Sequence, residues 1–288
     1  MKISSKDVVY SFSAQHKPAA KVGCGIKVDI ETYDCFCNQL RSEKDSFDKL
    51  DWDRINPATG PIWVEGAQPG DVLKVTSHKI ALSDYGTSIA GQDMGILGSM
   101  LSGTQTKIIP IREDGADFGN GRIFPLRKMI GVIGVAPKDS SINTGTPGRH
   151  GGNMDNTMVG EGANLYFNVE TEGALFALGD VHAVMGDGEI GVSGLEIPAT
   201  VTVSFELIKH ANVEFPMLEN EASWSVIASE PSVDQAVQSA TETMYRFLKP
   251  QLDLTDHEIV ILMSLVGNLQ ICQVVDPLKT VRFVVPKS

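Results

Sequence analysis

Polar residues that could bind a metal ion gather on glycine-rich segments between Thr144 and Glu196. The side chains concerned are two histidines, four acids and one amide: His150, Asn153, Asp155, Asp180, His182, Asp187 and Glu189. Histidine and carboxylate groups are ligands of hard or borderline divalent cations. Glycine lets the backbone turn sharply and leaves room for a ligand. The composition of these segments therefore predicts a metal site on loops between strands.

The spacing within these segments adds to this prediction. Asp180 and His182 are two positions apart, so on a strand both side chains point to the same face. Asp187 and Glu189 repeat that spacing a few residues later. If the intervening turn is a hairpin, the two pairs face each other across it. One acid could then bind a metal ion while another acts as a general base.

Each motif also has a structural explanation. A Gly-Asp-Gly run such as 186–188 is most often only a turn. Asp34 follows an alternating strand, where a strand-end cap is the simpler interpretation. Cys35 and Cys37 share one strand face and are better explained as small buried hydrophobic residues, because a CxC pair alone is a poor zinc motif. The density of acids favours a metal ion, because burying several carboxylates without a compensating cation is costly.

The elements that must position these residues are mostly strands. Period-two alternation from Val201 to Leu207 is typical of a half-buried strand. Similar short runs lie at 28–33, 71–77, 129–135, 165–169 and 174–178. Many short strands without amphipathic helices between them indicate a sandwich or barrel. The predicted fold is therefore mainly β, with a jelly-roll-like or barrel-like body.

The character of the chain changes near residue 210. Ser232 and Gln235 form a capping-box pattern before apolar residues at helical spacing, and Pro250 closes that segment. Thr255 and Glu258 form a second such pattern, which opens a helix that ends near Gly267. A strand over 280–285 follows. We therefore predict a β-rich body over 1–209 that carries the site, and a smaller α+β lobe over 210–288.

Composition excludes several classes of partner. Lys+Arg 24 against Asp+Glu 36 gives a net charge of −12, which repels phosphate backbones and argues against nucleic-acid binding. The longest apolar run, 259–266, is too short to span a bilayer, and no basic amphipathic segment suggests a membrane surface. The N-terminal residues contain no apolar signal segment, and the cysteines show no disulfide pattern. We therefore expect a cytoplasmic protein with reduced thiols.

Longer motifs give a family resemblance. The runs 145–155, 173–183 and 186–189, together with 31–35, 60–73 and 271–282, resemble the acetamidase/formamidase family over nearly the whole chain. The resemblance implies a β-rich fold with a small α+β lobe, hydrolysis of short aliphatic amides to a carboxylate and ammonia, and cytoplasmic homo-oligomers, often dimers. Longer members carry Gln where this chain has Met185, which puts its substrate range in question. The chain length suggests the compact acetamidase-like branch.

The resemblance carries the family's motifs onto particular residues. Its His-Gly-Gly-Asn-x-Asp falls on His150, Asn153 and Asp155; its Gly-Asp-x-His falls on Asp180 and His182; its Gly-Asp-Gly-Glu falls on Asp187 and Glu189.

A mechanistic hypothesis follows for these residues. We expect His150, His182, Asp180 and Asp34 to bind a divalent cation, zinc in the first place, with one position open for water. Glu189 would act as the general base, with Asp187 orienting it or serving as a further ligand. Asn153 would stabilise the oxyanion. Asp155 and Met185 would contact the substrate.

Two alternatives stay open on the sequence alone. The first is a non-catalytic β-sandwich in which the same acids hold a structural Ca²⁺ ion and a ligand binds nearby. The second is a thiol-dependent amidase that uses Cys35 or Cys272, although neither cysteine has a neighbouring base in the sequence.

Overall fold

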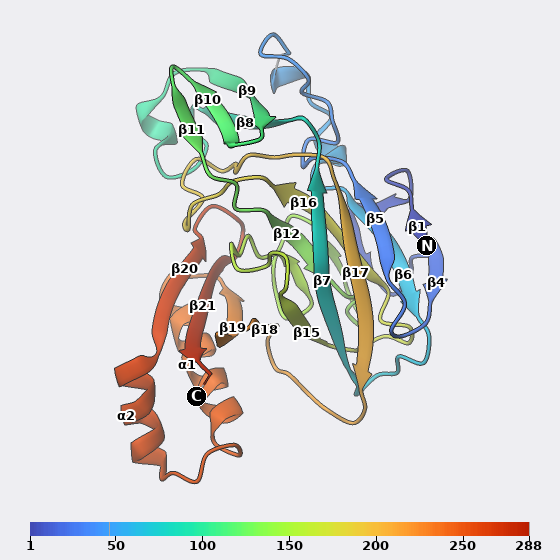
Figure 1. The fold of residues 1–288 in the computed structure, drawn as a ribbon, viewed down its shortest axis with the longest axis vertical. Coiled ribbons are helices and arrows are strands. Elements are labelled where there is room, and N and C mark those ends of the chain that lie inside the picture. The colour runs from blue at the N-terminus through green and yellow to red at the C-terminus, as the bar shows by residue number, and fades with distance from the viewer. Residues whose placement is uncertain (46, 288) are drawn as a thin grey trace.

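The computed structural model describes residues 1–45 and 47–287, and strands dominate it (Figure 1). The largest sheet has nine strands. In spatial order these are β1 (Lys2–Ile3), β5 (Val28–Thr32), β17 (Ala199–Ile208), β7 (Val72–Leu82), β15 (Asn164–Asn168), β18 (Met217–Glu219), β19 (Ser223–Glu230), β21 (Lys279–Pro286) and β20 (Asn268–Gln273). The prediction of a mainly β body followed by a smaller α+β region is confirmed.

A second sheet carries most of the site. Its strands, in spatial order, are β14 (Gly151–Asn153), β12 (Met129–Gly134), β16 (Phe176–His182), β6 (Ala58–Val64) and β2 (Val8–Val9), with β4 (Ala20–Val22) also paired to β6. Every residue of β12, β14 and β16 is buried. Strands buried on both faces read as continuous apolar runs, which is why these segments lack strict alternation.

Smaller elements complete the β structure. A four-stranded sheet consists of β11 (Arg122–Phe124), β10 (Gly115–Gly119), β9 (Thr104–Arg112) and β8 (Tyr85–Gly91). It projects beyond one end of the two larger sheets in Figure 1. A pair is formed by β13 (Ser141–Asn143) and β3 (Ser11–Ser13), and three short 3₁₀ helices are η1 (Phe47–Lys49), η2 (Trp52–Arg54) and η3 (Gly98–Met100).

The main core lies between the two larger sheets. It draws Val28, Leu73 and Phe205 from the nine-stranded sheet and Ile62 and Phe176 from the other, all buried. The rings of Phe176 and Phe205 meet edge to face with centroids 5.1 Å apart. In β17 buried positions alternate with partly exposed ones, as its sequence predicts. The site strands are thus fixed from behind by an apolar layer.

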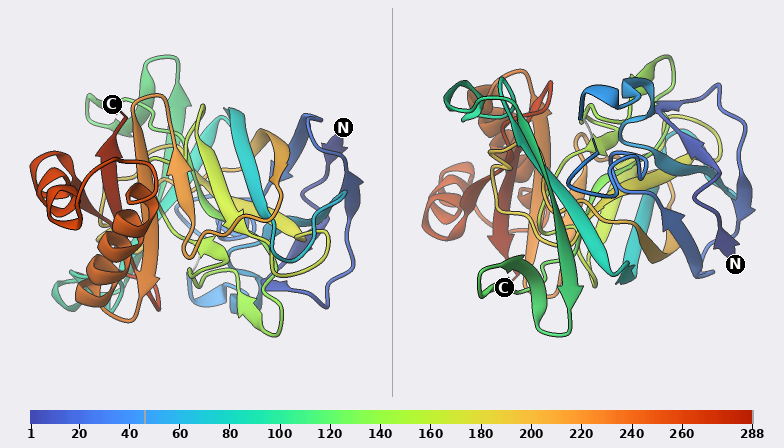
Figure 2. Two further views of the ribbon diagram at one scale, coloured as in Figure 1. Left: turned by 90° about the horizontal axis from the view of Figure 1, so that it is seen from below. Right: turned by 90° about the horizontal axis from the view of Figure 1, so that it is seen from above.

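The C-terminal region contains both α-helices of the described residues. Helix α1 (Val233–Leu248) is capped by Ser232, and α2 (Asp256–Val266) begins with a capping box of Thr255 and Glu258. In the left view of Figure 2 the helices lie on the outer side of β19 and β21, away from the body. A second apolar cluster holds them there. The C-terminal strands nevertheless continue the large sheet through the β15–β18 pair.

Two local expectations were wrong. The strand expected at 174–178 begins only at Phe176, because Ala174 and Leu175 adopt left-handed backbone angles (φ 57° and 50°) that form a turn. Cys35 and Cys37 do not share a strand face, since β5 ends at Thr32 and Cys37 has φ 55° in the following turn. Among the described residues, neither helix is long and apolar enough to cross a membrane.

Candidate active site

The site is built on β16 and its neighbours. Asp180 and His182 stand near the end of β16, and β12 runs alongside, with Gly131 between the partners of Val181 and Gly179. Gly131 must be glycine, because a Cβ there would collide with the carboxylates of Asp180 and Asp155. Asp155 follows β14, on the other side of β12. Two carboxylates from different strands therefore converge over one glycine.

The chain after β16 turns back along the end of the same strand. Leu195 and Ile197 make backbone hydrogen bonds with 181–184, and Glu196 pairs with His182. The expected hairpin thus forms, but with a different register. Glu196, rather than Asp187 or Glu189, lies across from His182. Asp187 and Glu189 occupy the long loop between the two arms.

The result is a buried cluster of one histidine and several acids. His182 Nε2 lies 3.0 Å from Glu196 Oε2, 3.4 Å from Asp180 Oδ1 and 3.9 Å from Asp155 Oδ1. The carboxylate of Glu189 joins Asp155 and His182, with the three donor atoms within 4.8 Å of one another. All five side chains are buried.

Four atoms of this cluster make no hydrogen bond of acceptable geometry, although His182 Nε2 and Glu196 Oε2 lie 3.0 Å apart. They are Asp155 Oδ1, Asp180 Oδ1, His182 Nε2 and Glu196 Oε2, each shielded from solvent. A buried polar group without a partner costs about 1–3 kcal/mol, and a charged one costs more. The three carboxylate oxygens lie 3.0 to 3.9 Å from His182 Nε2, so a cation bound at that nitrogen would lie among them. The donor set of one imidazole and several carboxylates suits a borderline divalent cation.

The pKa values of the cluster also favour a bound cation. Burial raises the pKa of Glu189 to about 8 and that of Glu196 to about 7. Burial also raises the pKa of Asp155 well above its usual range, helped by the charge of Glu189. Burial alone would lower the pKa of His182, but Glu196 and Asp180 outweigh it and raise that pKa. The cluster therefore holds more acids than one imidazolium can keep ionised.

A further acid approaches from the C-terminal region. Asp276, in the loop between β20 and β21, accepts a hydrogen bond from Asn153 Nδ2 at 3.0 Å. Burial and the neighbouring Asp155 raise its pKa well above the usual value. Asn153 Oδ1 is buried without a partner. Asn153 therefore links the C-terminal loop to the cluster, and one of its amide hydrogens is already engaged.

Asp187 points away from the cluster. Its carboxylate pairs with the guanidinium of Arg282, at 2.5 Å and 3.1 Å from its two terminal nitrogens, and accepts a hydrogen bond from Thr157. Arg282 is only 2% exposed and also donates to Asn156. The pair ties the loop that carries Glu189 to β21.

His150 lies at a distance along the sheet. Its carbonyl accepts from Val135 N–H, whereas Met154, beside Asp155, bonds to Gly131. The His150 ring reaches back only to Gly152, where a Cβ would lie 2.9 Å from Nε2, and Gly152 pairs with Ile133, two residues along β12 from Gly131. The His150 ring packs edge to face on Phe12 and both ring nitrogens lack partners. Burial lowers its pKa to about 4.

Asp34 and Cys35, in the turn after β5, approach the cluster on the side of Asp180 and Glu196. Asp34 Oδ1 accepts the backbone N–H of Asn38 at 2.7 Å, so this carboxylate closes its own turn. Burial raises the pKa of Asp34 to about 6, and Asp180 contributes to that rise. Cys35 Sγ lies within 4.8 Å of carboxylate oxygens of Asp180 and Glu196. Burial raises the pKa of this thiol well above its usual range, which disfavours a free thiolate nucleophile.

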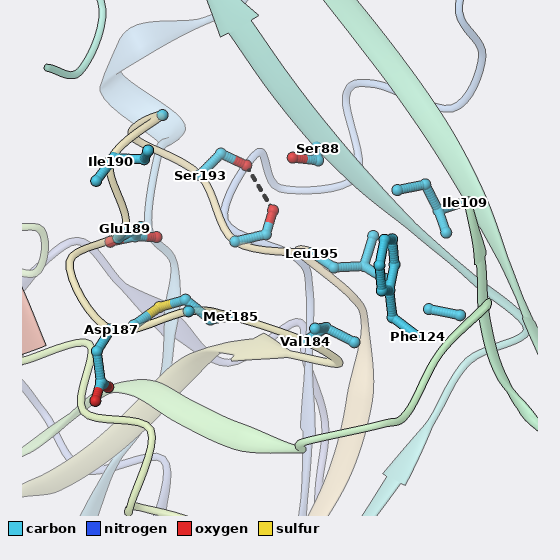
Figure 3. Close-up of a pocket in the computed structure, with 14 residues that line it drawn as sticks. Ser88, Ile109, Phe124, Val184, Met185, Asp187, Glu189, Ile190, Ser193 and Leu195 are labelled. Atoms are coloured by element: carbon cyan, nitrogen blue, oxygen red, sulfur yellow. Dashed lines mark hydrogen bonds between the residues drawn. The ribbon is translucent and has the colours of Figure 1, made fainter. Parts of the chain in front are cut away.

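A cavity of about 400 Å³ opens beside the cluster (Figure 3). Glu189 and Met185 line it, and Met185 Sδ also lies 3.3 Å from His182 Nδ1. Gly194 passes over the histidine ring, where a Cβ would lie 2.6 Å from Nδ1. Glu189 therefore belongs both to the buried cluster and to the wall of a cavity that a small molecule could occupy.

Motif reasoning did not single out Glu196, Asp276 or Arg282 as site residues. Each is a lone charged residue in an apolar run: Leu195-Glu196-Ile197, Val275-Asp276-Pro277 and Val281-Arg282-Phe283. A charge at a position that the pattern predicts to be buried needs a partner. That conflict is the signal in the sequence that could have found them.

Comparison with known proteins identifies the family of this chain. The model of the acetamidase/formamidase family matches residues 11–143 and 136–285. A Schizosaccharomyces pombe protein named as a formamidase is 24% identical in an alignment 262 positions long, which covers 69% of this chain and 63% of that protein. The match thus spans less than two thirds of that relative's length.

Solved structures match over nearly the full chain. A predicted acetamidase/formamidase from Thermoanaerobacter tengcongensis is 48% identical, with a TM-score of 0.97 over 99% of this chain and 95% of that one. An acetamidase from Bacillus halodurans is 40% identical, with a TM-score of 0.97 over 99% of this chain and 97% of that one.

Proposed function

The chain belongs to the acetamidase/formamidase family, and we propose that it hydrolyses short aliphatic amides to a carboxylate and ammonia with a water activated at a divalent metal site. The observation that carries this proposal is the set of four unpartnered, buried donor atoms around His182, next to a cavity that Glu189 lines. Family membership supports amide hydrolysis, and the geometry supports where it would take place.

The side chains present fit a divalent cation. We propose His182, Asp155, Asp180 and Glu196 as its ligands, with Cys35 as a further donor on the same side as Asp180 and Glu196. Relative to the sequence-based hypothesis, this set keeps His182 and Asp180 and adds Asp155 and Glu196. His150 and Asp34 are less suited, because His150 lies further along the sheet and Asp34 is engaged by its own turn. When bound, the cation would lower the pKa of a water molecule to about 7 and polarise the amide carbonyl.

Glu189 is the residue we propose for proton transfer. A carboxylate whose pKa is raised toward neutrality can both take a proton from water and release it. Glu189 takes the proton as the water oxygen bonds to the carbonyl carbon, and it passes that proton to the nitrogen as the C–N bond breaks. Its place at the boundary of cluster and cavity gives it access to both atoms.

Neighbouring residues would position this machinery. Asp187 anchors the Glu189 loop through Arg282, rather than orienting Glu189 directly. Asn153 fixes Asp276, and its second amide hydrogen is left for the oxyanion role proposed from the sequence. Met185 supports the His182 ring and forms part of the substrate wall.

The first test is ammonia release from formamide, acetamide and propionamide, before and after chelation and with metal add-back. We expect activity to fall with chelation and to return with Zn²⁺ or another borderline divalent ion. Activity that is indifferent to chelation would contradict the metal-dependent mechanism. A chain that binds metal but hydrolyses no amide would favour the ligand-binding alternative.

Replacement of Glu189 by Gln tests the assignment of the base. We expect Glu189→Gln to lower kcat by about 10²–10⁴-fold, the usual contribution of a general base, while metal content measured by mass spectrometry stays unchanged. His182→Ala, as the matched comparison, should lose metal. If Glu189→Gln lost metal and kept its activity per bound ion, the roles would have to be exchanged.

Assembly and location stay predictions. We propose a homodimer or higher homo-oligomer in the cytoplasm, as the family resemblance implies and as the free cysteines of the described chain allow. Light scattering of the purified protein would measure the assembly, and a monomeric mass at micromolar concentration would contradict it.

A further inference from the structure

The cavity beside Glu189 is much larger than the smallest amides. It measures about 400 Å³, within the range of about 300–1,000 Å³ that is typical of drug-sized ligands. Acetamide has four heavy atoms and occupies roughly 120 Å³, if each atom takes about the volume of a water molecule. Acetamide would therefore leave most of the cavity unfilled.

The two ends of the cavity differ in polarity. Figure 3 places Glu189 and Asp187 at one end and Ile109, Phe124 and Leu195 at the other. The apolar end joins two structural units, because Ile109 and Phe124 come from the four-stranded sheet and Leu195 from the returning arm of the hairpin. A molecule that spans the cavity would present a polar group to Glu189 and an apolar group to this wall.

The charged residues of the cavity lining limit the class of ligand that it can bind. The lining contains no lysine, arginine or histidine among the described residues. Its ionisable members are Glu189 and Asp187, and Asp187 is already paired with Arg282. No side chain of this lining could pair with a carboxylate on the ligand, so the lining favours a neutral molecule.

We propose that the preferred substrates are neutral amides bearing one apolar group of about the size of a butyl chain or a phenyl ring, which fills the wall formed by Ile109, Phe124 and Leu195. This inference rests on the proposed amidase function and specifies its substrate class. The apolar group could sit on the acyl carbon or on the nitrogen, and the same wall would bind it in either case.

A chain-length series measures the proposal. We expect kcat/KM to rise about fourfold for each methylene added from acetamide to pentanamide, whose carbonyl carbon carries a butyl chain, the gain that burial of one methylene predicts. N-butylacetamide, assayed by amine release, shows whether the nitrogen side is the favoured one. Succinamic acid (a short amide with a carboxylate) should be a poor substrate.

The variant Phe124→Ala tests the wall itself. Phe124 is 45% exposed, so its truncation should not disturb folding. We expect the ratio of kcat/KM for the favoured butyl amide to that for acetamide to fall about tenfold. Ile123→Ala is the matched control, because Ile123 is the preceding residue of β11, is 40% exposed and does not line the cavity. It should leave the ratio unchanged.

A binding measurement tests this inference independently of the proposed amidase function. Calorimetric titration into Glu189→Gln should show that pentanamide and N-butylacetamide bind more tightly than acetamide, and that Phe124→Ala weakens this binding. Such binding without turnover of any amide by the unmodified protein would overturn the amidase proposal and support the ligand class. Turnover of acetamide that declines with every added methylene, with no gain for N-butylacetamide, would overturn the inference alone. Binding of neither butyl amide would also overturn it.

Discussion

At the scale of single residues, the site is held in unusual backbone conformations. Asp155, Asp180 and Glu189 have φ angles of 42°, 53° and 47°, in the left-handed region. Non-glycine residues in such conformations cost on the order of 1–3 kcal/mol each and cluster at functional sites. Three acids of one buried cluster share this feature. These strained backbone conformations direct the three carboxylates into the buried cluster.

Gly131 gives a sharp test at this scale. We expect Gly131→Ala to reduce metal content and amidase activity at least tenfold, because the new methyl group would displace both Asp155 and Asp180. Metal analysis and ammonia release would measure this. Gly23→Ala is the control, since its Cβ would meet chiefly the flexible side chains of Glu65 and Ile26. Equal metal content in the two variants would contradict the convergence of the carboxylates over Gly131.

Sequence reasoning could find part of the cluster and not the rest. Asp180 and His182 could be paired because their spacing on one strand places them on one face. Glu196 and Asp276 could not be placed, because their proximity depends on hairpin register and on a contact across 123 residues, between Asn153 and Asp276. For Asp187 the sequence pattern was misleading. Its motif suggested chemistry, but its side chain binds Arg282.

At the scale of elements, the hairpin that begins at β16 and the strand β21 act as one support. The long loop between the hairpin arms carries Glu189, and the pair between the exposed Asp187 and the buried Arg282 fastens it to β21. Arg282 also donates to Asn156 and Thr157, next to Asp155 in the chain. One guanidinium thus holds two of the segments that supply acids to the site.

Removal of this guanidinium should weaken both stability and catalysis. We expect Arg282→Met to lower the free energy of unfolding by about 1–3 kcal/mol, because buried acceptors such as Asn156 lose their hydrogen-bond donor, and to lower kcat. Urea unfolding and steady-state kinetics would measure the two effects. Arg246→Met breaks an ion pair with Glu214 in which the two side chains are 51% and 35% exposed, and should cost about 0–1 kcal/mol. Similar losses in the two variants would argue against the anchoring role.

Elements with local signals were predictable, and those defined by long-range pairing were less so. The capping residues Ser232 and Thr255 marked both helices. The strand from Val201 to Leu207 followed from alternation and lies within β17. The sequence pattern could not show that the C-terminal strands continue the body's sheet, because the β15–β18 pairing joins distant segments.

At the scale of the whole molecule, the buried acids should link stability to pH in the metal-free protein. Folding raises the pKa of Glu189 to about 8 and of Glu196 to about 7, from about 4.3 in an unfolded chain. Between these limits the folded state binds more protons than the unfolded state. Stability is therefore highest near the lower limit and falls as the pH rises through the folded pKa values.

This linkage predicts a specific pH profile. We expect the free energy of unfolding of the chelated protein to fall by a few kcal/mol between about pH 5 and about pH 8, and metal to reduce that fall. Glu189→Gln should flatten the profile because it removes one of the titrating groups. Glu113→Gln, at an exposed position, should not. Urea titrations at several pH values would measure the slopes, and an unchanged slope in Glu189→Gln would contradict the assignment.

The route of the chain through the site has a consequence for refolding. The residues of the cluster come from four separate segments: the turn after β5, the chain at β14, the hairpin that begins with β16, and the β20–β21 loop. No continuous stretch of chain therefore contains the cluster. Contacts between segments so distant in sequence are slow to form, because loop-closure entropy must be overcome first. After dilution from denaturant, the helix signal of α1 and α2 should recover before the ability to take up metal. Regain of metal uptake would thus mark the last kinetic phase of folding, at which the two regions of the chain dock.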